Sequence, residues 1–244
     1  KEVPAAWHSH LRALTRDAAF ILKNHTVDFT RYSRLLQHTE VRENEFPCAV
    51  LSDVNHLKHK TLLLPSWDPY VGPLLEAVLK NSGTDARLLK GTSESMQRSL
   101  THNTGQCLPL NMIVQDAIDY IGEHRLDPAA TVLWIIKSKL SCNLSMFPYF
   151  MKKLLNDYGQ GLEQTAVYMG DVIFYDFSLP VAINAYLAYM FGGYIRKIGC
   201  RIRPYEINKG AADRVIREAM DLLYDAFLHG KPKERVLGKI MQAF

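Results

Sequence analysis

Four short apolar runs, each followed by a stretch with helical periodicity, constrain the fold of this chain more than any other feature. The clearest is Thr-Val-Leu-Trp-Ile-Ile at 131–136, and the others are 61–65, 86–89 and 166–170. Runs this short and this continuously apolar are typical of parallel strands buried on both faces. We therefore expect an α/β fold: a mainly parallel sheet with flanking helices, right-handed crossovers, and further helical elements at the N- and C-terminal ends.

Helices are expected between these strands because apolar residues recur there at three- and four-residue spacing. The expected helices are 72–82, 93–98, 109–124, one starting near Pro148, 181–197 and 210–228. The segment Arg-Ile-Arg-Pro-Tyr-Glu at 201–206 is expected to be extended, because Pro204 disfavours a helical conformation at Arg203. A contact between Arg203 and Glu206, or capping of a neighbouring helix, would then hold the last helix on the sheet.

The chain is expected to have three parts. Residues 1–60 are interpreted as a helical N-terminal and connecting segment, with an amphipathic helix at 5–24 and a second helix at 28–38. Residues 61–200 are interpreted as the α/β domain, and residues 201–244 as the Arg-Pro-Tyr-Glu segment with helices packing on that domain. Because the chain begins on Lys1, it is also expected to be a fragment of a longer protein.

Composition limits the classes of partner. The chain has 244 residues with 29 basic and 25 acidic side chains, and this small excess of scattered positive charge does not predict nucleic-acid binding. No run of about 18 apolar residues predicts a membrane span. The most apolar stretch, 179–198, contains Pro180 and Arg196 and is interpreted as a buried helix.

Most sequence motifs of catalysis are absent. The chain has no Gly-x-Ser-x-Gly, no Walker A loop and no Gly-x-Gly-x-x-Gly turn. The pairs His8-x-His10 and His56-x-x-His59 have weak metal-ligand spacing, so solvated or partner-facing histidines are favoured. Asp171 and Asp176 are interpreted as helix or turn caps, in preference to acid/base groups. No catalytic residue is assigned.

Two of the four cysteines lie next to predicted elements that favour the thiolate form of a cysteine side chain. Cys107 comes just before a helix N-terminus, where free N–H groups stabilise negative charge, and Cys142 lies between the strongest strand and a helix. If both loops leave the same edge of the sheet, the two sulfurs converge. The alternative is that each is a small buried hydrophobe, since two thiolates do not fill the four positions of a typical cluster. Cys48 and Cys200 are interpreted as packing residues.

Four segments, taken in order, resemble the acyl-CoA dehydratase activase-related proteins. They are LLLPSWDPYVGPLLEAVL, LTHNTGQCLPLNMIVQDAIDYI, DPAATVLWIIKSKLSCNLSMFPYFMKKLL and RIRPYEINKG, and the resemblance covers roughly residues 60–230. Members of that family combine an ATPase module with segments similar to subunits of 2-hydroxyacyl-CoA dehydratases. In this chain Cys107-Leu-Pro and Ser-Cys142-Asn occupy the places of the family's cysteine motifs.

The resemblance implies that Cys107 and Cys142 are ligands of an iron–sulfur cluster, of the 4Fe–4S type. It also implies low-potential electron transfer to an acyl-CoA dehydratase-type reaction in the cytoplasm, as part of anaerobic metabolism. The implied partners are the ATPase (activase) module, another dehydratase-like domain of the same or a partner chain, and a second copy of the chain. The resemblance also implies a third cysteine ligand, which would lie upstream of this fragment unless Cys48 or Cys200 supplies it.

Two alternatives remain open. The chain can be a non-catalytic α/β interaction or oligomerisation module with inert cysteines, whose contacts come from the histidine-rich N-terminal region and from Arg214, Arg217, Lys231 and Lys233. A third hypothesis, based on the family alone, is an acyl-CoA site where Trp67, Tyr70 and the helix N-terminus near Gly72 hold an adenine or a phosphate.

Overall fold

The computed structural model describes residues 50–102, 108–138 and 143–230, together with residues 232, 236, 239 and 240. The helices expected at 5–24 and 28–38 lie outside the described residues, as do Cys48, Cys107 and Cys142.

The described residues contain a five-stranded sheet in which every pair of neighbouring strands is parallel. The strand order is β1-β5-β4-β2-β3. The strands are β1 (Val50–Leu51), β2 (Thr61–Leu64), β3 (Asp85–Leu88), β4 (Thr131–Ile136) and β5 (Ala166–Gly170). The predicted α/β class is therefore confirmed. β1 falls in the segment interpreted as connecting, and it joins the sheet as an edge strand beside β5.

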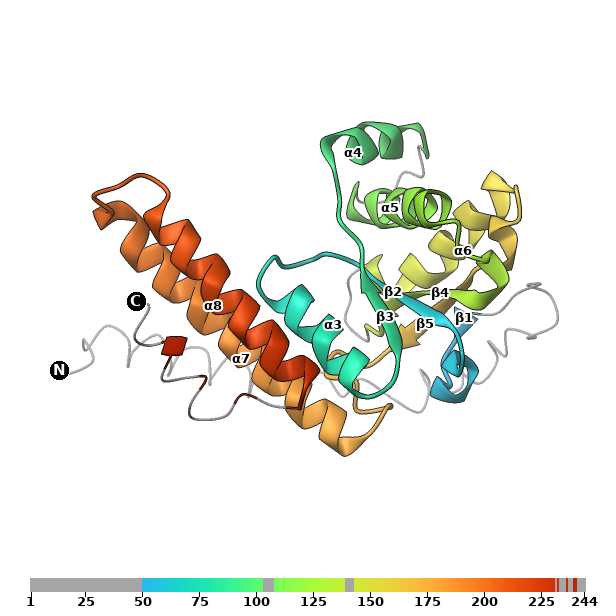
Figure 1. Ribbon diagram of the computed structural model, residues 1–244. Coiled ribbons are helices and arrows are strands. Elements are labelled where there is room, and N and C mark those ends of the chain that lie inside the picture. Colours follow the sequence, from blue (N-terminus) through green and yellow to red (C-terminus); the bar gives the residue numbers. More distant parts are fainter. Residues whose placement is uncertain are drawn as a thin grey trace, which may run out of the picture. The chain divides into compact units, whose positions relative to one another are not determined.

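Helices cover both faces of this sheet (Figure 1). The helices are α3 (Val71–Asn81), α4 (Ser93–Ser99), α5 (Leu108–His124), α6 (Phe147–Tyr158), α7 (Leu179–Ile202) and α8 (Ala211–Leu228). On one face Leu62 and Leu64 of β2 share a buried cluster with residues of α3, α7 and α8. On the other, Leu63 shares a cluster with residues of α5 and α6. Burial on both faces explains the continuous apolar run of β2.

The prediction that residues 201–206 are extended is wrong. α7 continues to Ile202, Arg203 has helical dihedrals (φ −52°, ψ −42°), and residues Arg203–Tyr205 form a 3-10 turn. Pro204 is tolerated because it stands in the first turn of that 3-10 helix, where a missing N–H costs nothing. The Glu206 carboxylate accepts hydrogen bonds from the N–H groups of Gly210 and Ala212, so the capping alternative is confirmed for Glu206.

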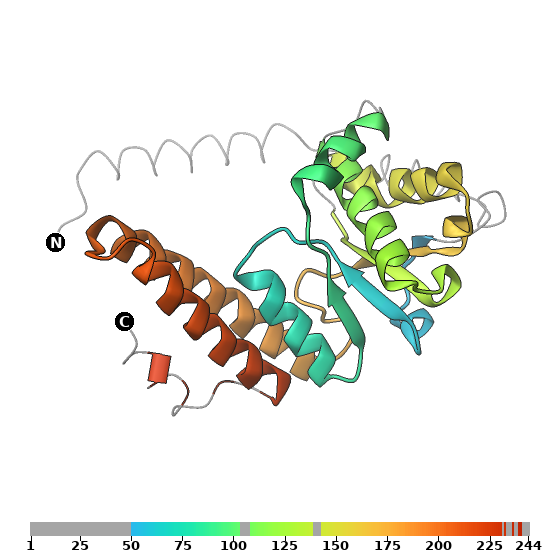
Figure 2. The ribbon, with the colours of Figure 1, turned by 45° about the horizontal axis from the view of Figure 1, so that its top comes forward.

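α7 and α8 form a long antiparallel hairpin against α3 (Figure 2). α7 was interpreted as a buried helix, and this is wrong: only one of its faces is buried. Val181, Ala185, Ala188 and Ile195 lie in the core, whereas the opposite face is exposed. No helix among the described residues has both the length and the apolar character needed to cross a bilayer.

Small residues let α7 approach α3 closely. A Cβ at Gly192 would lie 2.7 Å from Val71 Cγ2 and 3.2 Å from the Val71 backbone nitrogen, whereas a Cβ at the neighbouring Gly193 would meet nothing within 4 Å. The contact at Gly192 therefore depends on the absence of a side chain.

Gly192→Ala is expected to destabilise the protein by about 1–2 kcal/mol, because the added methyl group pushes α7 away from α3. Gly193→Ala is the matched control, and it is expected to stabilise the protein by up to about 1 kcal/mol, since alanine favours the helix. Urea unfolding of the two variants measures both effects. Two variants of equal stability would contradict the close approach of α7 and α3.

Candidate functional site

The candidate site lies at the carboxyl edge of the sheet, where the topology reverses. β2 is hydrogen-bonded to β3 on one side and to β4 on the other. The chain therefore moves from β2 to β3 in one direction across the sheet, and from β4 to β5 in the opposite direction. A crevice outside the strand ends forms at such a switch point in open α/β sheets. We define the carboxyl edge by the residues that directly follow the strands: 65–70 after β2, 137–138 after β4 and 171–174 after β5.

The segment after β2 neutralises the N-terminus of α3. Asp68 Oδ1 accepts hydrogen bonds from the backbone N–H groups of Tyr70 (2.8 Å) and Val71 (2.9 Å), and Asp68 Oδ2 forms an ion pair with Arg196 of α7. The Arg196 guanidinium lies 5.7 Å from the centre of the Tyr70 ring. A carboxylate therefore already occupies the position that a phosphate would take at this helix.

Gly72, the third residue of the acyl-CoA hypothesis, has a packing role. A Cβ there would lie 3.1 Å from a methyl group of Leu88, so the glycine allows α3 to pack closely on β3. Trp67 remains 49% exposed. The phosphate part of that hypothesis thus has no support from the geometry of α3.

Arg203 links the end of α7 to this edge and to α8. Its guanidinium donates to the Tyr70 hydroxyl (2.9 Å) and to Asp213 Oδ1 of α8 (2.8 Å). The hydrogen bond to Tyr70, followed by the one to Asp213, raises the pKa of Arg203 above its ordinary value. Arg203 does not pair with Glu206 as one sequence alternative had it, because Glu206 caps α8.

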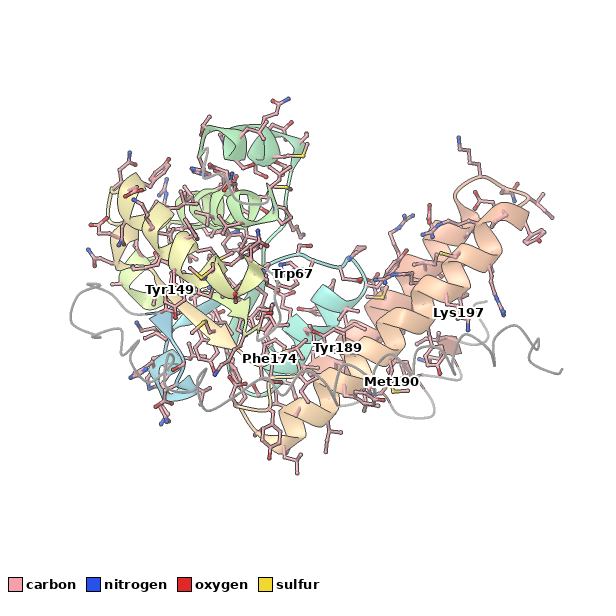
Figure 3. All side chains as sticks on the ribbon, turned by 180° about the vertical axis from the view of Figure 1, so that it is seen from behind. Trp67, Tyr149, Phe174, Tyr189, Met190 and Lys197 are labelled. Atoms are coloured by element: carbon pink, nitrogen blue, oxygen red, sulfur yellow. The ribbon has the colours of Figure 1, made fainter. Side chains whose placement is uncertain are left out.

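Aromatic rings fill the centre of the edge (Figure 3). The Trp134 ring lies between Trp67, at 6.3 Å between ring centres, and Phe174, at 5.1 Å. Phe174 is buried and has φ +57°, a left-handed conformation that costs a non-glycine residue about 1 kcal/mol or more. The Trp134 indole N–H is buried and has no hydrogen-bond partner among the described residues. Strain and an unpaired donor thus occur together at this edge.

The two aspartates after β5 have different roles. Asp171 Oδ1 accepts a hydrogen bond from the Ile173 N–H (2.9 Å), so its interpretation as a turn cap is confirmed. Asp176 is no cap: its Oδ2 accepts a hydrogen bond from the Tyr168 hydroxyl, and its Oδ1 is buried without a partner in the described part of the chain. Burial, and then the hydrogen bond to Asp176, raises the pKa of Tyr168, so this phenol stays protonated.

Cys107 and Cys142 lie outside the described residues, but the elements that flank them are described. Leu110 in the first turn of α5, Ile135 near the end of β4 and Phe147 at the start of α6 belong to one buried cluster. Cys107 is three residues from Leu110, and Cys142 is five residues from Phe147, spans of at most about 11 Å and 18 Å of extended chain. The described neighbours of both cysteines in the sequence thus contribute to the same buried cluster.

The cysteine and histidine side chains in the described part of the chain form no metal site. Cys200 is exposed on α7, so its interpretation as a packing residue is wrong. Among the residues for which positions are given, no group of three or more His, Cys, Asp and Glu side chains could hold a metal ion. His56 lies in a 3-10 turn, and His59 follows it with φ +62°.

A polar network between α4 and α5 was not anticipated from the sequence. His102 Nε2 is 3.1 Å from Gln115 Oε1, Gln115 donates to Asp119 Oδ1 (2.9 Å), and Arg98 donates to Asp119 Oδ2 (2.6 Å). The i, i+4 spacing of Gln115 and Asp119 is the one signal that could have indicated part of it. The network holds α4 against the helix that begins directly after Cys107.

A hollow of about 740 Å³ lies at the opposite edge of the sheet, near the starts of β2 and β3. Its Asp85 carboxylate accepts from Thr61 Oγ1 (2.7 Å) and pairs with Arg87 (3.1 Å). The hydrogen bonds from Arg87 are the main cause of a lowered pKa at Asp85. The Asp85 carboxylate is thus satisfied by Thr61 and Arg87.

No protein-family model, no curated protein and no solved structure matches this chain.

Proposed function

We propose that this chain is the cluster-binding part of an iron–sulfur redox protein that delivers low-potential electrons to an acyl-CoA dehydratase-type reaction. Cys107 and Cys142 would be its ligands. The observation that supports the proposal is the buried cluster shared by the first turn of α5, the end of β4 and the start of α6, because these elements are the described neighbours of both cysteines in the sequence.

The donor set is consistent with a shared cluster. Two thiolates supply two of the four ligand positions of a 4Fe–4S cluster, which carries out one-electron transfer when bound. The other positions would come from a partner chain or from a small thiol. α5 begins at Leu108, directly after Cys107 in the sequence, and a thiolate beside a helix N-terminus would be stabilised by the helix dipole and free N–H groups. The buried side chains of Trp134 and Phe174 would limit water on the other face of the same edge.

The proposal includes partners and a compartment. An ATP-driven activase module would supply the electron, because no nucleotide-binding motif occurs in this chain, and a second dehydratase-like domain would complete the substrate site. Thiolate ligation and a low potential require a reducing compartment, and we infer the cytoplasm of a cell with anaerobic metabolism.

Iron and sulfide analysis tests this proposal. The chain is purified without oxygen, supplied with iron and sulfide, and desalted. Wild type and the matched control Cys200→Ala are expected to retain both elements, while Cys107→Ala and Cys142→Ala lose most of them. Equal iron in all four proteins would refute the assignment.

A second candidate, an interaction or oligomerisation module with inert cysteines, is favoured by the exposed apolar face of α7. The positive charge expected on the last helix does not support it, since α8 carries Arg214 and Arg217 but four carboxylates. Thiol labelling distinguishes the two candidates. If Cys107 and Cys142 resist labelling until the protein unfolds, while Cys200 is labelled at once, the result favours the interaction module.

A further inference from the structure

Oxidisable aromatic rings form a line from the surface of the molecule into its core. Trp67, in the segment after β2, is half exposed, and its ring centre lies 6.3 Å from that of the buried Trp134 in β4. Aromatic rings whose centres are about 4.5–7 Å apart are in direct contact. The first two rings of the line therefore connect solvent with the buried face of the sheet.

Tyr168 of β5 continues this line. Trp134 and Tyr168 are register partners in neighbouring parallel strands, and both belong to the buried cluster on the α3 side of the sheet. A Cβ at Gly170 would overlap the Trp134 indole nitrogen and lie 2.9 Å from Tyr168 Cε1, so the edges of the two rings converge over this glycine. The rings packed beside them, Phe174 and Phe177, are phenyl groups, which lose an electron far less readily than indole or phenol.

Of the two buried rings, only Tyr168 has a proton acceptor. Its hydroxyl donates to Asp176 Oδ2, whereas the buried Trp134 indole N–H has no hydrogen-bond partner in the part of the chain that the structure describes. An oxidised Trp134 would thus remain a buried cation, which is costly in an apolar cluster. An oxidised phenol is a strong acid, and it is stabilised when a neighbouring base takes its proton.

Asp176 is stabilised by accepting that proton. Its Oδ1 is buried without a hydrogen-bond partner among the described residues, which raises the free energy of the ionised carboxylate. Burial, and then the hydrogen bond to Asp176, raises the pKa of Tyr168, so the proton is on the phenol before oxidation. Moving it to Asp176 as the phenol is oxidised leaves two neutral groups and removes the buried charge.

We propose that Trp67, Trp134 and Tyr168 form a relay that carries one-electron oxidation from the surface to a buried tyrosyl radical. A one-electron oxidant in solution, such as a peroxide-derived radical, takes an electron from Trp67 and is itself reduced. Trp67 regains an electron from Trp134, and Trp134 regains one from Tyr168. In this last step the Tyr168 O–H bond breaks, the proton passes to Asp176 Oδ2, and a neutral phenoxyl radical remains beside a neutral carboxylic acid. No cysteine takes part, so the relay stands or fails independently of iron binding.

Flash photolysis followed by electron paramagnetic resonance tests the relay. The intact chain, without added iron, is illuminated with ruthenium(II) tris-bipyridine and a cobalt(III) ammine acceptor, and frozen after the radicals on exposed tyrosines have decayed. Wild type is expected to show a persistent tyrosyl signal, because Tyr168 is fully buried, and Tyr168→Phe is expected to lose it. Tyr149→Phe is the matched control. It removes a tyrosine exposed on α6, which packs on the opposite face of the sheet, and should keep the signal.

Two further variants test the steps of the relay without changing Tyr168. Trp134→Phe keeps an aromatic ring in the core but interrupts the line, and Asp176→Asn keeps the size of the side chain but cannot take the proton. Both are expected to lose the persistent signal while circular dichroism shows the native fold, a result that a purely structural role would not give. A wild type without a persistent signal, a signal that survives Tyr168→Phe, or one that survives both Trp134→Phe and Asp176→Asn would each overturn the proposal.

Discussion

Gly170→Ala is expected to lower the free energy of unfolding by about 3 kcal/mol, one of the two largest effects expected of a single substitution in this chain. Gly170 ends β5, and a Cβ there would overlap the Trp134 indole nitrogen and lie 2.9 Å from Tyr168 Cε1. Both rings are buried among aromatic neighbours and have no space into which to move. Urea unfolding followed by circular dichroism measures the loss.

Gly122→Ala provides the control for this substitution. Gly122 is exposed in α5, and a Cβ there meets nothing within 4 Å, so the variant is expected to gain up to about 1 kcal/mol from helix propensity. If Gly170→Ala were as stable as Gly122→Ala, the close packing of Trp134 on the end of β5 would be wrong.

Lys152→Met is expected to cost about 3 kcal/mol, because it removes the donor to two carbonyl groups. Lys152 lies on α6 and is only 5% exposed, and its ammonium donates to the carbonyl oxygens of Glu163 (2.6 Å) and Thr165 (2.8 Å). These hydrogen bonds fasten α6 to the turn that leads into β5. Methionine keeps the apolar stem but leaves both oxygens without this partner. Thermal and urea unfolding measure the change.

The same substitution at the adjacent, exposed Lys153 shows how much of the stability loss comes from removing a charge and how much from removing a buried ammonium. Its side chain is 66% exposed and pairs with Asp157 at 2.7 Å, an i, i+4 ion pair of small value. Lys153→Met removes the same charge, and its stability is expected to stay within about 0.5 kcal/mol of wild type. Equal losses at Lys152 and Lys153 would contradict the role of the buried ammonium.

The sheet could be predicted from the sequence because its strands are buried on both faces. β4 and β5 occupy the expected residues, 131–136 and 166–170, and β2 and β3 differ from their expected bounds by one residue. β1 was missed because Val50–Leu51 is too short to carry a periodic pattern, and only its pairing with β5 defines it as a strand.

Features that depend on contacts between distant parts of the chain could not be predicted from the sequence. Lys152 and Lys153 are identical neighbours, and only the course of the chain after α6 buries one of them. The helical conformation of Arg203 before Pro204 depends on Tyr70 and Asp213, which lie on other elements. The exposure of apolar α7 side chains such as Tyr186 and Met190 could not be predicted. The composition of an apolar stretch does not distinguish a fully buried helix from one with an exposed apolar face.

At the switch point, the sequence identified the segments but not their interactions. The cysteine loops were expected at the carboxyl edge, and Cys107 and Cys142 lie outside the described residues, so this stays a prediction. The left-handed Phe174, the unpaired Trp134 indole and the Tyr168–Asp176 hydrogen bond have no local sequence signal, because each arises from contacts between β4, β5 and the segment after β5.

The parallel pairing of β1 with β5 also determines when the sheet can be completed during synthesis. Val50 pairs with Val167 and Leu51 with Tyr168, so β1 cannot pair with β5 until the chain has been made well past β4. Closing so long a loop carries a large entropic cost, and contacts of such sequence separation slow folding. Until β5 emerges, the β5 side of β4 stays unpaired and its apolar residues lack their neighbour. The nascent chain is therefore open to association with other chains between the synthesis of β4 and that of β5.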